Sequence, residues 1–307
     1  MKRIGPVLVA LCLLLAAAGC GLRQEADGAG RFAAVVQLRA DDVGDFARMR
    51  MLAQSAKARG ADLVIFPEES VFGWLNPQAF TQGAPVPGAY SDRFAAIARD
   101  VGIWVAAGLA EQGPPAGPGA LPGAHYAYNS AILIDRQGRI VLHQRKVNVL
   151  RNAFDPAACK AILNLEQCNY LPGDLADVAV ADTPFGKVSL LVCSDAFAEP
   201  ATPALERLKA LRPDIVIVPW GITAASPDQC GADGFNATMS AVRASGYLGS
   251  GVVGANAVGT RRYGKYLPSV YCGTSGYAAP SGPPAEAEPP QAELAVFRME
   301  PVGSRAE

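Results

Sequence analysis

The chain has 307 residues, with 27 lysines and arginines against 28 aspartates and glutamates. A formal net charge of -1 excludes a strongly basic protein of the kind that binds nucleic acid through its overall charge. Because 50% of the residues are hydrophobic and 18% are charged, a wholly disordered chain is excluded as well. The length suits one large domain or two small ones.

The first 19 residues are typical of an export signal. Lys2 and Arg3 precede an apolar run over residues 7–18, which is shorter than the roughly 20 residues that span a bilayer. The residues before and at Cys20, AAGC, resemble a bacterial lipobox, in which the chain is cleaved before the cysteine and the thiol is acylated. We therefore expect a lipidated Cys20, a flexible tether over residues 20–30, and an extracytoplasmic protein anchored to a cell membrane by lipid. An ordinary secretory signal is the alternative.

Short apolar runs alternate with amphipathic segments through most of the chain, which predicts an α/β fold. The two strands that follow the Gly/Pro-rich loop at residues 112–123 are joined by a short turn, so they predict a hairpin and not a purely parallel sheet. Residues 147–183 have no regular pattern, and residues 281–307 read as a Pro-rich linker with a peripheral extension. Strands are predicted over residues 32–38, 62–66, 103–109, 128–135, 139–145, 187–193, 214–219, 250–255 and 272–279, and helices over residues 42–59, 91–100, 203–211 and 236–246.

An odd number of cysteines remains after the export signal and Cys20 are set aside, and an oxidising compartment favours disulfides. Four of the remaining five can pair in three ways while one stays free. Cys159 and Cys168 are close in sequence within an irregular segment, so we expect a local bridge between them. A second bridge from Cys230 to Cys272 would then leave Cys193 as a free thiol.

Polar side chains follow three predicted strands at the points where the strands end. Glu68 follows residues 62–66, Lys146 follows the second hairpin strand, and Cys193 closes the run VSLLVC. In open α/β sheets, loops at the carboxyl ends of strands assemble the binding site. A carboxylate, an ammonium and a thiol in such positions predict a site for nucleophilic catalysis.

These three residues suffice for attack on an amide without a histidine. Glu68 would take the proton of the Cys193 thiol, and Lys146 would stabilise the thiolate and, with the backbone N–H of Ser194, the oxyanion. Glu68 would then pass the proton to the leaving amine, and a thioester would remain for water to hydrolyse.

Several motifs carry a resemblance to a known family. The segments FPE at residues 66–68, RK at 145–146 and VCSD at 192–195 resemble the Glu, Lys and Cys motifs of the nitrilase superfamily of carbon-nitrogen hydrolases. The resemblance covers roughly residues 31–280. Four further segments are similar to the biotinidase and pantetheinase (vanin) branch, namely residues 67–74, 146–148, 183–186 and 273–280.

The resemblance implies an αββα sandwich for residues 31–280, often dimerised so that sheets stack. It also implies a Glu68, Lys146 and Cys193 triad that acts on amides without a cofactor. A metal site is not expected, because His125 and His143 are the only histidines of the chain. The substrate would be a small linear amide, related to the pantetheine or biotinyl amides of the vanin branch.

The resemblance further suggests residues around the triad. Trp74 and Trp220 would line the substrate pocket, and Asp195 would support the Cys193 loop. The superfamily usually has a second active-site glutamate after the lysine, where this chain has Ala153. Glu166, farther along the same segment, is the candidate to replace it. Glu69 would have a structural or supporting role.

Three alternatives remain open at this point. The missing glutamate near Ala153 is compatible with a binding lipoprotein that has lost activity, and an amine in place of water would make the enzyme an acyltransferase. A dyad of Cys193 with His143 is the third. The GSGVVG segment at residues 249–254 is expected to be a strand and not a dinucleotide site, because apolar strand residues follow it.

Overall fold

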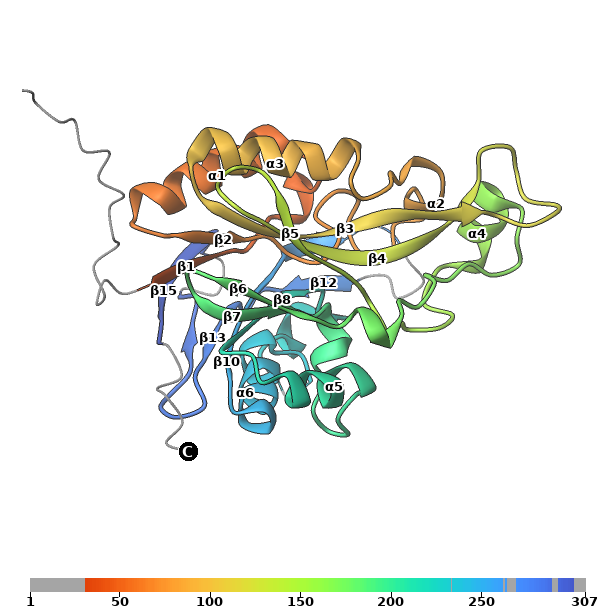
Figure 1. Ribbon diagram of the computed structural model, residues 1–307. Coiled ribbons are helices and arrows are strands. Elements are labelled where there is room, and N and C mark those ends of the chain that lie inside the picture. Colours follow the sequence, from red (N-terminus) through yellow and green to blue (C-terminus); the bar gives the residue numbers. More distant parts are fainter. Residues whose placement is uncertain (1–30, 233, 262, 264–268, 289–291, 301–307) are drawn as a thin grey trace, which may run out of the picture.

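Two β-sheets lie face to face and are covered on their outer sides by helices in the computed structural model, which describes residues 31–232, 234–261, 263, 269–288 and 292–300. Helices α1 (Phe46–Ala58) and α3 (Ala89–Val101) cover the outer face of the first sheet, and α5 (Pro203–Leu211) and α6 (Ala237–Leu248) cover that of the second (Figure 1). This arrangement confirms the predicted αββα sandwich. Across the described ranges, no helix combines the length and the apolar character that crossing a bilayer requires.

The first sheet has six strands, of which β1, β2 and β3 run parallel and β3, β4 and β5 form an antiparallel meander. The turn between β4 and β5 contains Gly138 at φ +80°, a conformation that glycine adopts at little cost, and the predicted hairpin is confirmed. In sheet order the strands are β15 (Leu294–Met299), β1 (Arg31–Val36), β2 (Leu63–Ile65), β3 (Trp104–Pro115), β4 (His125–Ile134) and β5 (Ile140–Arg145).

The second sheet also has six strands, with β7, β8 and β10 parallel at its centre. In sheet order these are β14 (Ala285–Glu286), β13 (Gly276–Ala278), β10 (Gly251–Asn256), β8 (Ile215–Trp220), β7 (Gly186–Leu190) and β6 (Val180–Thr183). A small third sheet contains β11 (Val258–Arg261), β12 (Ser269–Cys272) and β9 (Thr223–Ala224). The short helices α2 (Ala79–Gln82) and α4 (Pro156–Leu163) and four single 3₁₀ turns, at 40–42, 175–177, 193–196 and 227–229, complete the described elements.

Side chains that point alternately to the two faces of each strand divide the interior into two hydrophobic cores. On β1, Ala34 and Val36 face the helices α1 and α3, while Ala33 and Val35 face the second sheet. Since successive side chains of a strand point to opposite faces, one apolar run fills both layers. This explains why the strands appear in the sequence as continuous apolar segments.

The C-terminal segment differs from the prediction of a linker with a peripheral extension over residues 281–307. Part of it forms β14 and β15, and β15 pairs antiparallel with β1 from Arg31 opposite Met299 to Val36 opposite Leu294. Leu294 and Met299 are buried. The sequence LAVF is apolar enough to be a strand, and without it β1 would present an unpaired edge. Residues 1–30 and 301–307 lie outside the described residues, so the lipidated Cys20 stays a prediction.

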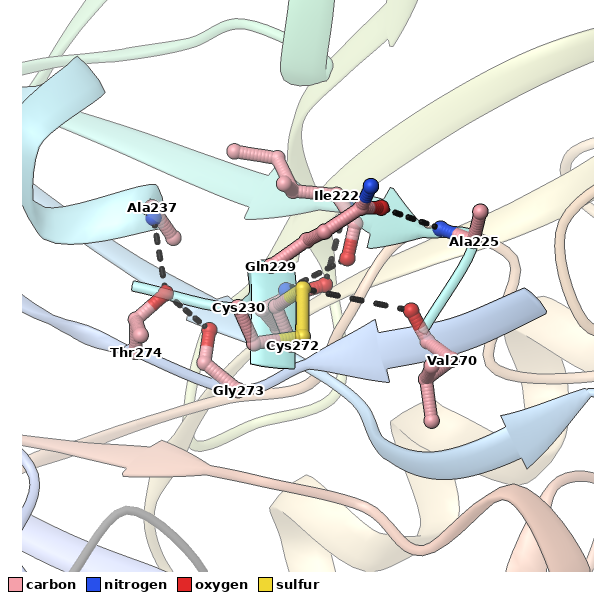
Figure 2. The surroundings of a disulfide bond; sticks show 10 residues. Ile222, Ala225, Gln229, Cys230, Ala237, Val270, Cys272, Gly273 and Thr274 are labelled. Atoms are coloured by element: carbon pink, nitrogen blue, oxygen red, sulfur yellow. Dashed lines mark hydrogen bonds between the residues drawn. A yellow bond between two sulfur atoms is a disulfide. The ribbon is translucent and has the colours of Figure 1, made fainter. Parts of the chain in front are cut away.

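Both expected disulfides are present, and Cys193 is a buried free thiol. The first bridge joins Cys159 of α4 to Cys168. The second joins Cys230 to Cys272 at the end of β12 (Figure 2). Figure 2 also shows the next part of this segment reaching α6, where the Thr274 hydroxyl accepts a hydrogen bond of 2.8 Å from the N–H of Ala237. The second disulfide therefore ties the third sheet to the loop that precedes α6.

We expect the second disulfide to contribute more stability than the first, because it closes a loop of 42 residues and the first closes one of 9. The chain-entropy model gives roughly 4 kcal/mol for the longer loop and roughly 2.5 kcal/mol for the shorter one. Urea unfolding of a Cys230→Ser/Cys272→Ser variant and a Cys159→Ser/Cys168→Ser variant measures both. A larger loss in the second variant would contradict this order.

Candidate active site

The three residues predicted to form a catalytic triad come together between the two sheets. Glu68 follows β2, Lys146 follows β5, and Cys193 lies in the 3₁₀ turn after β7. Their exposed fractions are 2%, 2% and 6%. A lysine and a glutamate are almost never fully buried unless they are paired, so the arrangement itself indicates a specialised site.

Glu68 accepts two hydrogen bonds on one oxygen and leaves its other oxygen without a partner among the described residues. The Lys146 Nζ donates to Oε1 at 2.6 Å, and Asn129 Nδ2 donates to the same oxygen at 2.7 Å. The backbone N–H of Glu68 donates to the carbonyl of Trp220 at 3.1 Å, which ties this loop to the second sheet. Asn129 was missed in the sequence analysis, although an asparagine within the apolar run of β4 was a usable signal.

Two glycines make room for Glu68. A Cβ on Gly221 would lie 2.0 Å from Glu68 Oε2, and a Cβ on Gly108 would lie 2.6 Å from the Glu68 Cα. Both distances are shorter than any real contact. A larger residue at either position would displace the carboxylate.

Cys193 has φ +45°, a left-handed conformation that is uncommon for a residue other than glycine. Such conformations persist where the surrounding structure imposes them, as at sharp turns that present a nucleophile. Burial and the neighbouring negative charge of Glu68 raise the pKa of the Cys193 thiol to about 12, against the opposing effects of Lys146 and the Gly221 N–H. At neutral pH the thiol is therefore protonated, and it needs a base at the moment of attack.

Asp195 holds the Cys193 loop against the Lys146 loop. Its carboxylate accepts hydrogen bonds from the backbone N–H of Asn148 at 2.6 Å and of Val147 at 3.0 Å. Burial raises the pKa of Asp195 to about 6, with these N–H groups and Lys146 opposing the rise. Asp195 thus fixes the Lys146 loop to the Cys193 loop.

Ser194 and Asn148 form a second link between the same loops. Ser194 Oγ donates to the Asn148 carbonyl at 2.7 Å, and Asn148 Nδ2 donates to the Ser194 carbonyl at 3.0 Å. The predicted role of the Ser194 N–H toward an oxyanion stays a prediction.

Glu166 does not lie with the triad, so the expectation that it replaces a second active-site glutamate is corrected. Its side chain is 86% exposed and pairs with Lys160 Nζ at 2.5 Å. The disulfide between Cys159 and Cys168 and helix α4 hold this part of the chain at the surface. Ala153, where the resemblance led us to expect that glutamate, is buried and apolar.

The two tryptophans are buried beside the site. Trp220 is 1% exposed, and its Nε1 is so close to Gly254 that a Cβ there would lie 2.2 Å away. Trp74 is 8% exposed, and its carbonyl accepts a hydrogen bond of 3.1 Å from Arg261 Nη1. Tyr271 accepts a 2.9 Å hydrogen bond from the Trp74 N–H through its hydroxyl oxygen. Contact of either indole with a substrate stays a prediction.

Sequence reasoning also missed a charged cluster on the strand faces next to Lys146. Glu111 of β3 accepts hydrogen bonds from Arg145 Nη2 at 2.5 Å, from Ser130 Oγ at 2.7 Å and from the His143 ring, whose Nε2 lies 2.7 Å away. Burial by itself would raise the pKa of Glu111, but His143, Arg145 and Ser130 outweigh it and lower the pKa to about 2. His143 is thereby engaged with Glu111, which argues against a dyad with Cys193.

Glu111→Gln is expected to reduce the free energy of unfolding at pH 7 by about 1–3 kcal/mol, because it removes charge-assisted hydrogen bonds from a buried group. Because the pKa of Glu111 is lowered, its ionised form stabilises the fold at any pH above the ordinary carboxyl pKa of 4.5. This stabilisation is lost as the pH falls toward about 2. Urea unfolding between pH 2 and 7 should show a smaller acid loss in the variant than in the wild type. Glu206→Gln, at an exposed position on α5, is the matched control. Equal decreases in the free energy of unfolding at pH 7 for Glu111→Gln and Glu206→Gln would contradict the prediction.

Metal ligands are not grouped in this site: within the ranges that the structure covers, no set of three or more His, Cys, Asp and Glu side chains could hold an ion.

The site and fold can be compared with known proteins. Formamidases from Bacillus cereus (strain Q1) and Bacillus thuringiensis (strain Al Hakam) are 34% and 33% identical over 119 residues, which is 37% of this chain and 33% of theirs. The match thus spans about a third of the length of these relatives.

Solved structures of an amidase from Nesterenkonia have the same fold. A cysteine-to-alanine mutant has a TM-score of 0.63 and 22% identity, with 88% of this chain and 90% of that chain covered. A double mutant in complex with acrylamide has a TM-score of 0.62 and 21% identity, with 89% and 92% covered. The family model described as carbon-nitrogen hydrolase matches residues 32–294, and the chain therefore belongs to the carbon-nitrogen hydrolase family.

Proposed function

We propose that this protein hydrolyses small linear amides through a thioester on Cys193. The observation that carries the proposal is the burial of Glu68, Lys146 and Cys193 in one place, with the Lys146 ammonium bonded to Glu68. The relatives named formamidase and amidase support amides as the substrate class.

The first half of the reaction forms the thioester. Glu68 accepts the thiol proton as the Cys193 sulfur attacks the carbonyl carbon, and Lys146 stabilises the negative oxygen that results. The carbon-nitrogen bond then breaks, and the amine leaves with the proton from Glu68. The raised pKa of Cys193 fits this order, because the thiol stays neutral until a substrate is present.

The second half releases the acid. Glu68 takes a proton from water, the resulting hydroxide adds to the thioester, and the carbon-sulfur bond breaks as sulfur regains the proton from Glu68. A structure of the Nesterenkonia amidase records the acetamide moiety of fluoroacetamide added covalently at its active-site cysteine. That adduct keeps its amide bond and shows a nucleophilic thiol in the relative, which supports Cys193 as the nucleophile here.

Within the amides, we propose a pantetheine- or biotinyl-type compound as the substrate. This choice rests on the four segments similar to the vanin branch.

We further propose that the enzyme is held by a lipid on Cys20 at the extracytoplasmic face of a membrane, since the AAGC segment precedes a polar tether. Cys20→Ala should then move the protein from the membrane fraction to the soluble fraction. Unchanged membrane association would reject the anchor without affecting the chemistry.

A substrate panel tests the activity. The purified enzyme is incubated with formamide, acetamide, pantetheine and N-biotinyl lysine, and the released amine and acid are quantified. Intact mass spectrometry of quenched samples should show the acyl group on Cys193 for at least one compound. Absence of turnover and of any adduct on all four would favour the binding-lipoprotein reading. Predominant formation of a new amide when a competing amine is added would indicate acyl transfer.

A further inference from the structure

Glu69 is a second carboxyl group inside the site, and the reaction above does not use it. Its exposed fraction is 0%, and neither of its carboxylate oxygens has a hydrogen-bond partner among the described residues. The residue has φ +53°, and its carbonyl accepts a 2.6 Å hydrogen bond from the N–H of Gly73. This turn, and not a regular strand, brings two successive glutamates into the interior.

The hydroxyl of Tyr170 is a second buried polar group near the site for which the described residues provide no hydrogen-bond partner. The residue is 5% exposed. Its ring packs against Phe80 and Phe154, with centroids 5.8 Å and 5.1 Å away, and the N–H of Leu171 bonds to the carbonyl of Ala127 on β4 at 2.8 Å. The residue is thus held from several sides, and its hydroxyl is near enough to Glu69 to influence the pKa of that carboxyl.

The charges around Glu69 permit one negative carboxylate and not two. Lys146 is already bonded to Glu68 at 2.6 Å, and no cation among the described residues forms an ion pair with Glu69. Tyr170 and Tyr263 are neutral hydroxyls that interact electrostatically with Glu69, and Arg261 Nη1 donates to the Trp74 carbonyl. Burial, and then the charge of Glu68, raise the pKa of Glu69 well above its ordinary value, with Lys146 and Tyr170 opposing the rise.

We propose that Glu69 is the second carboxyl of this active site, that it holds its proton at neutral pH, and that with Tyr170 it keeps Glu68 as the carboxylate bonded to Lys146. Glu69 is therefore a positioning residue. It takes the place that the sequence assigned to Glu166, whose side chain lies at the surface.

The protonation state of Glu69 affects the charge balance among Glu68, Lys146 and Cys193. If Glu69 were ionised, its negative charge would raise the pKa of Cys193 further and would compete with Glu68 for Lys146. A protonated Glu69 leaves the pair of Glu68 and Lys146 electrically balanced. The proposal deepens the amidase function, but the protonation state of Glu69 can be measured without any turnover.

Glu69→Gln is the decisive variant, because glutamine copies the shape and neutrality of a protonated glutamate. We expect Glu69→Leu and Tyr170→Phe to lower kcat for the best amide of the panel at least tenfold with little change in KM, and Glu69→Gln to recover most of the activity lost in Glu69→Leu from pH 6 to 8. The rate of Cys193 alkylation by iodoacetamide should have the same pH dependence in wild type and Glu69→Gln. Glu166→Gln, the same substitution at the exposed glutamate, is the control and should have no effect.

Infrared spectroscopy provides the readout that does not depend on activity. Wild-type protein at pH 8, where ordinary carboxyl groups are ionised, should show the carbonyl band of a protonated carboxylic acid, and the band should shift in Tyr170→Phe and vanish in Glu69→Gln. If the band is present and no amide is hydrolysed, the amidase function fails and the assignment of Glu69 stands. Absence of the band, or a shift of the Cys193 alkylation profile to lower pH in Glu69→Gln, would show that Glu69 is an anion and overturn the proposal.

Discussion

Cys193→Ala is expected to lower kcat for amide hydrolysis by about 10⁴-fold or more, because the variant lacks the sulfur that forms the covalent intermediate. Within the described residues Cys193 is the free thiol, as the other cysteines there are joined in disulfides. The variant should still bind the amide, since Glu68 and Lys146 remain. Steady-state kinetics measures the loss, and isothermal calorimetry measures substrate binding.

The matched control for this variant is Ser189→Ala, a buried substitution of similar size on β7, whose hydroxyl bonds to the carbonyl of Ala179 and not to the site. It should retain most of the activity. Turnover by Cys193→Ala at the wild-type rate would refute the thioester mechanism, and loss of activity in both variants would point to a damaged strand instead of a missing nucleophile.

Lys146→Met is expected to have two large effects. The free energy of unfolding at pH 7 should fall by about 3–5 kcal/mol, because Glu68 would be left as a buried charge without its partner at 2.6 Å. The kcat should fall by about 10²–10³-fold, as for loss of a group that stabilises an oxyanion. Burial by itself would lower the pKa of Lys146, but Glu68, Cys193 and Asp195 raise it above its ordinary value, so the wild-type lysine is charged throughout the working pH range.

Lys160→Met is the matched control, because Lys160 also pairs with a glutamate, but at the surface. Exposed pairs contribute about 0–1 kcal/mol, so this variant should unfold almost as the wild type does. The double variant Glu68→Leu/Lys146→Met removes both charges and should be more stable than Lys146→Met alone. Equal unfolding free energies for Lys146→Met and Lys160→Met would contradict the reading of a buried, coupled pair.

The strand pattern of the chain was accessible from the sequence because the core positions are apolar on both faces of the strands. The hairpin of β4 and β5 was predicted from its turn, and both disulfides from the distribution of cysteines. The strand β15 was not recognised, because a short apolar segment after a Pro-rich stretch has no local signal for its partner. It becomes a strand by pairing with β1, which precedes it by more than 250 residues in the chain.

The sequence by itself determined the family and the candidates Glu68, Lys146 and Cys193, since each stands at a strand end where an apolar core has no use for it. Only the tertiary structure decided which further groups join them. Asn129 and Tyr170 belong to other segments, and the two candidates for a second carboxyl, Glu69 and Glu166, have the same chemistry in the printed sequence. Burial separates them: Glu69 is 0% exposed, and the Glu166 side chain is 86% exposed. The residues next to a glutamate in the chain do not determine whether its carboxyl group is buried, because desolvation depends on every segment that packs around that group.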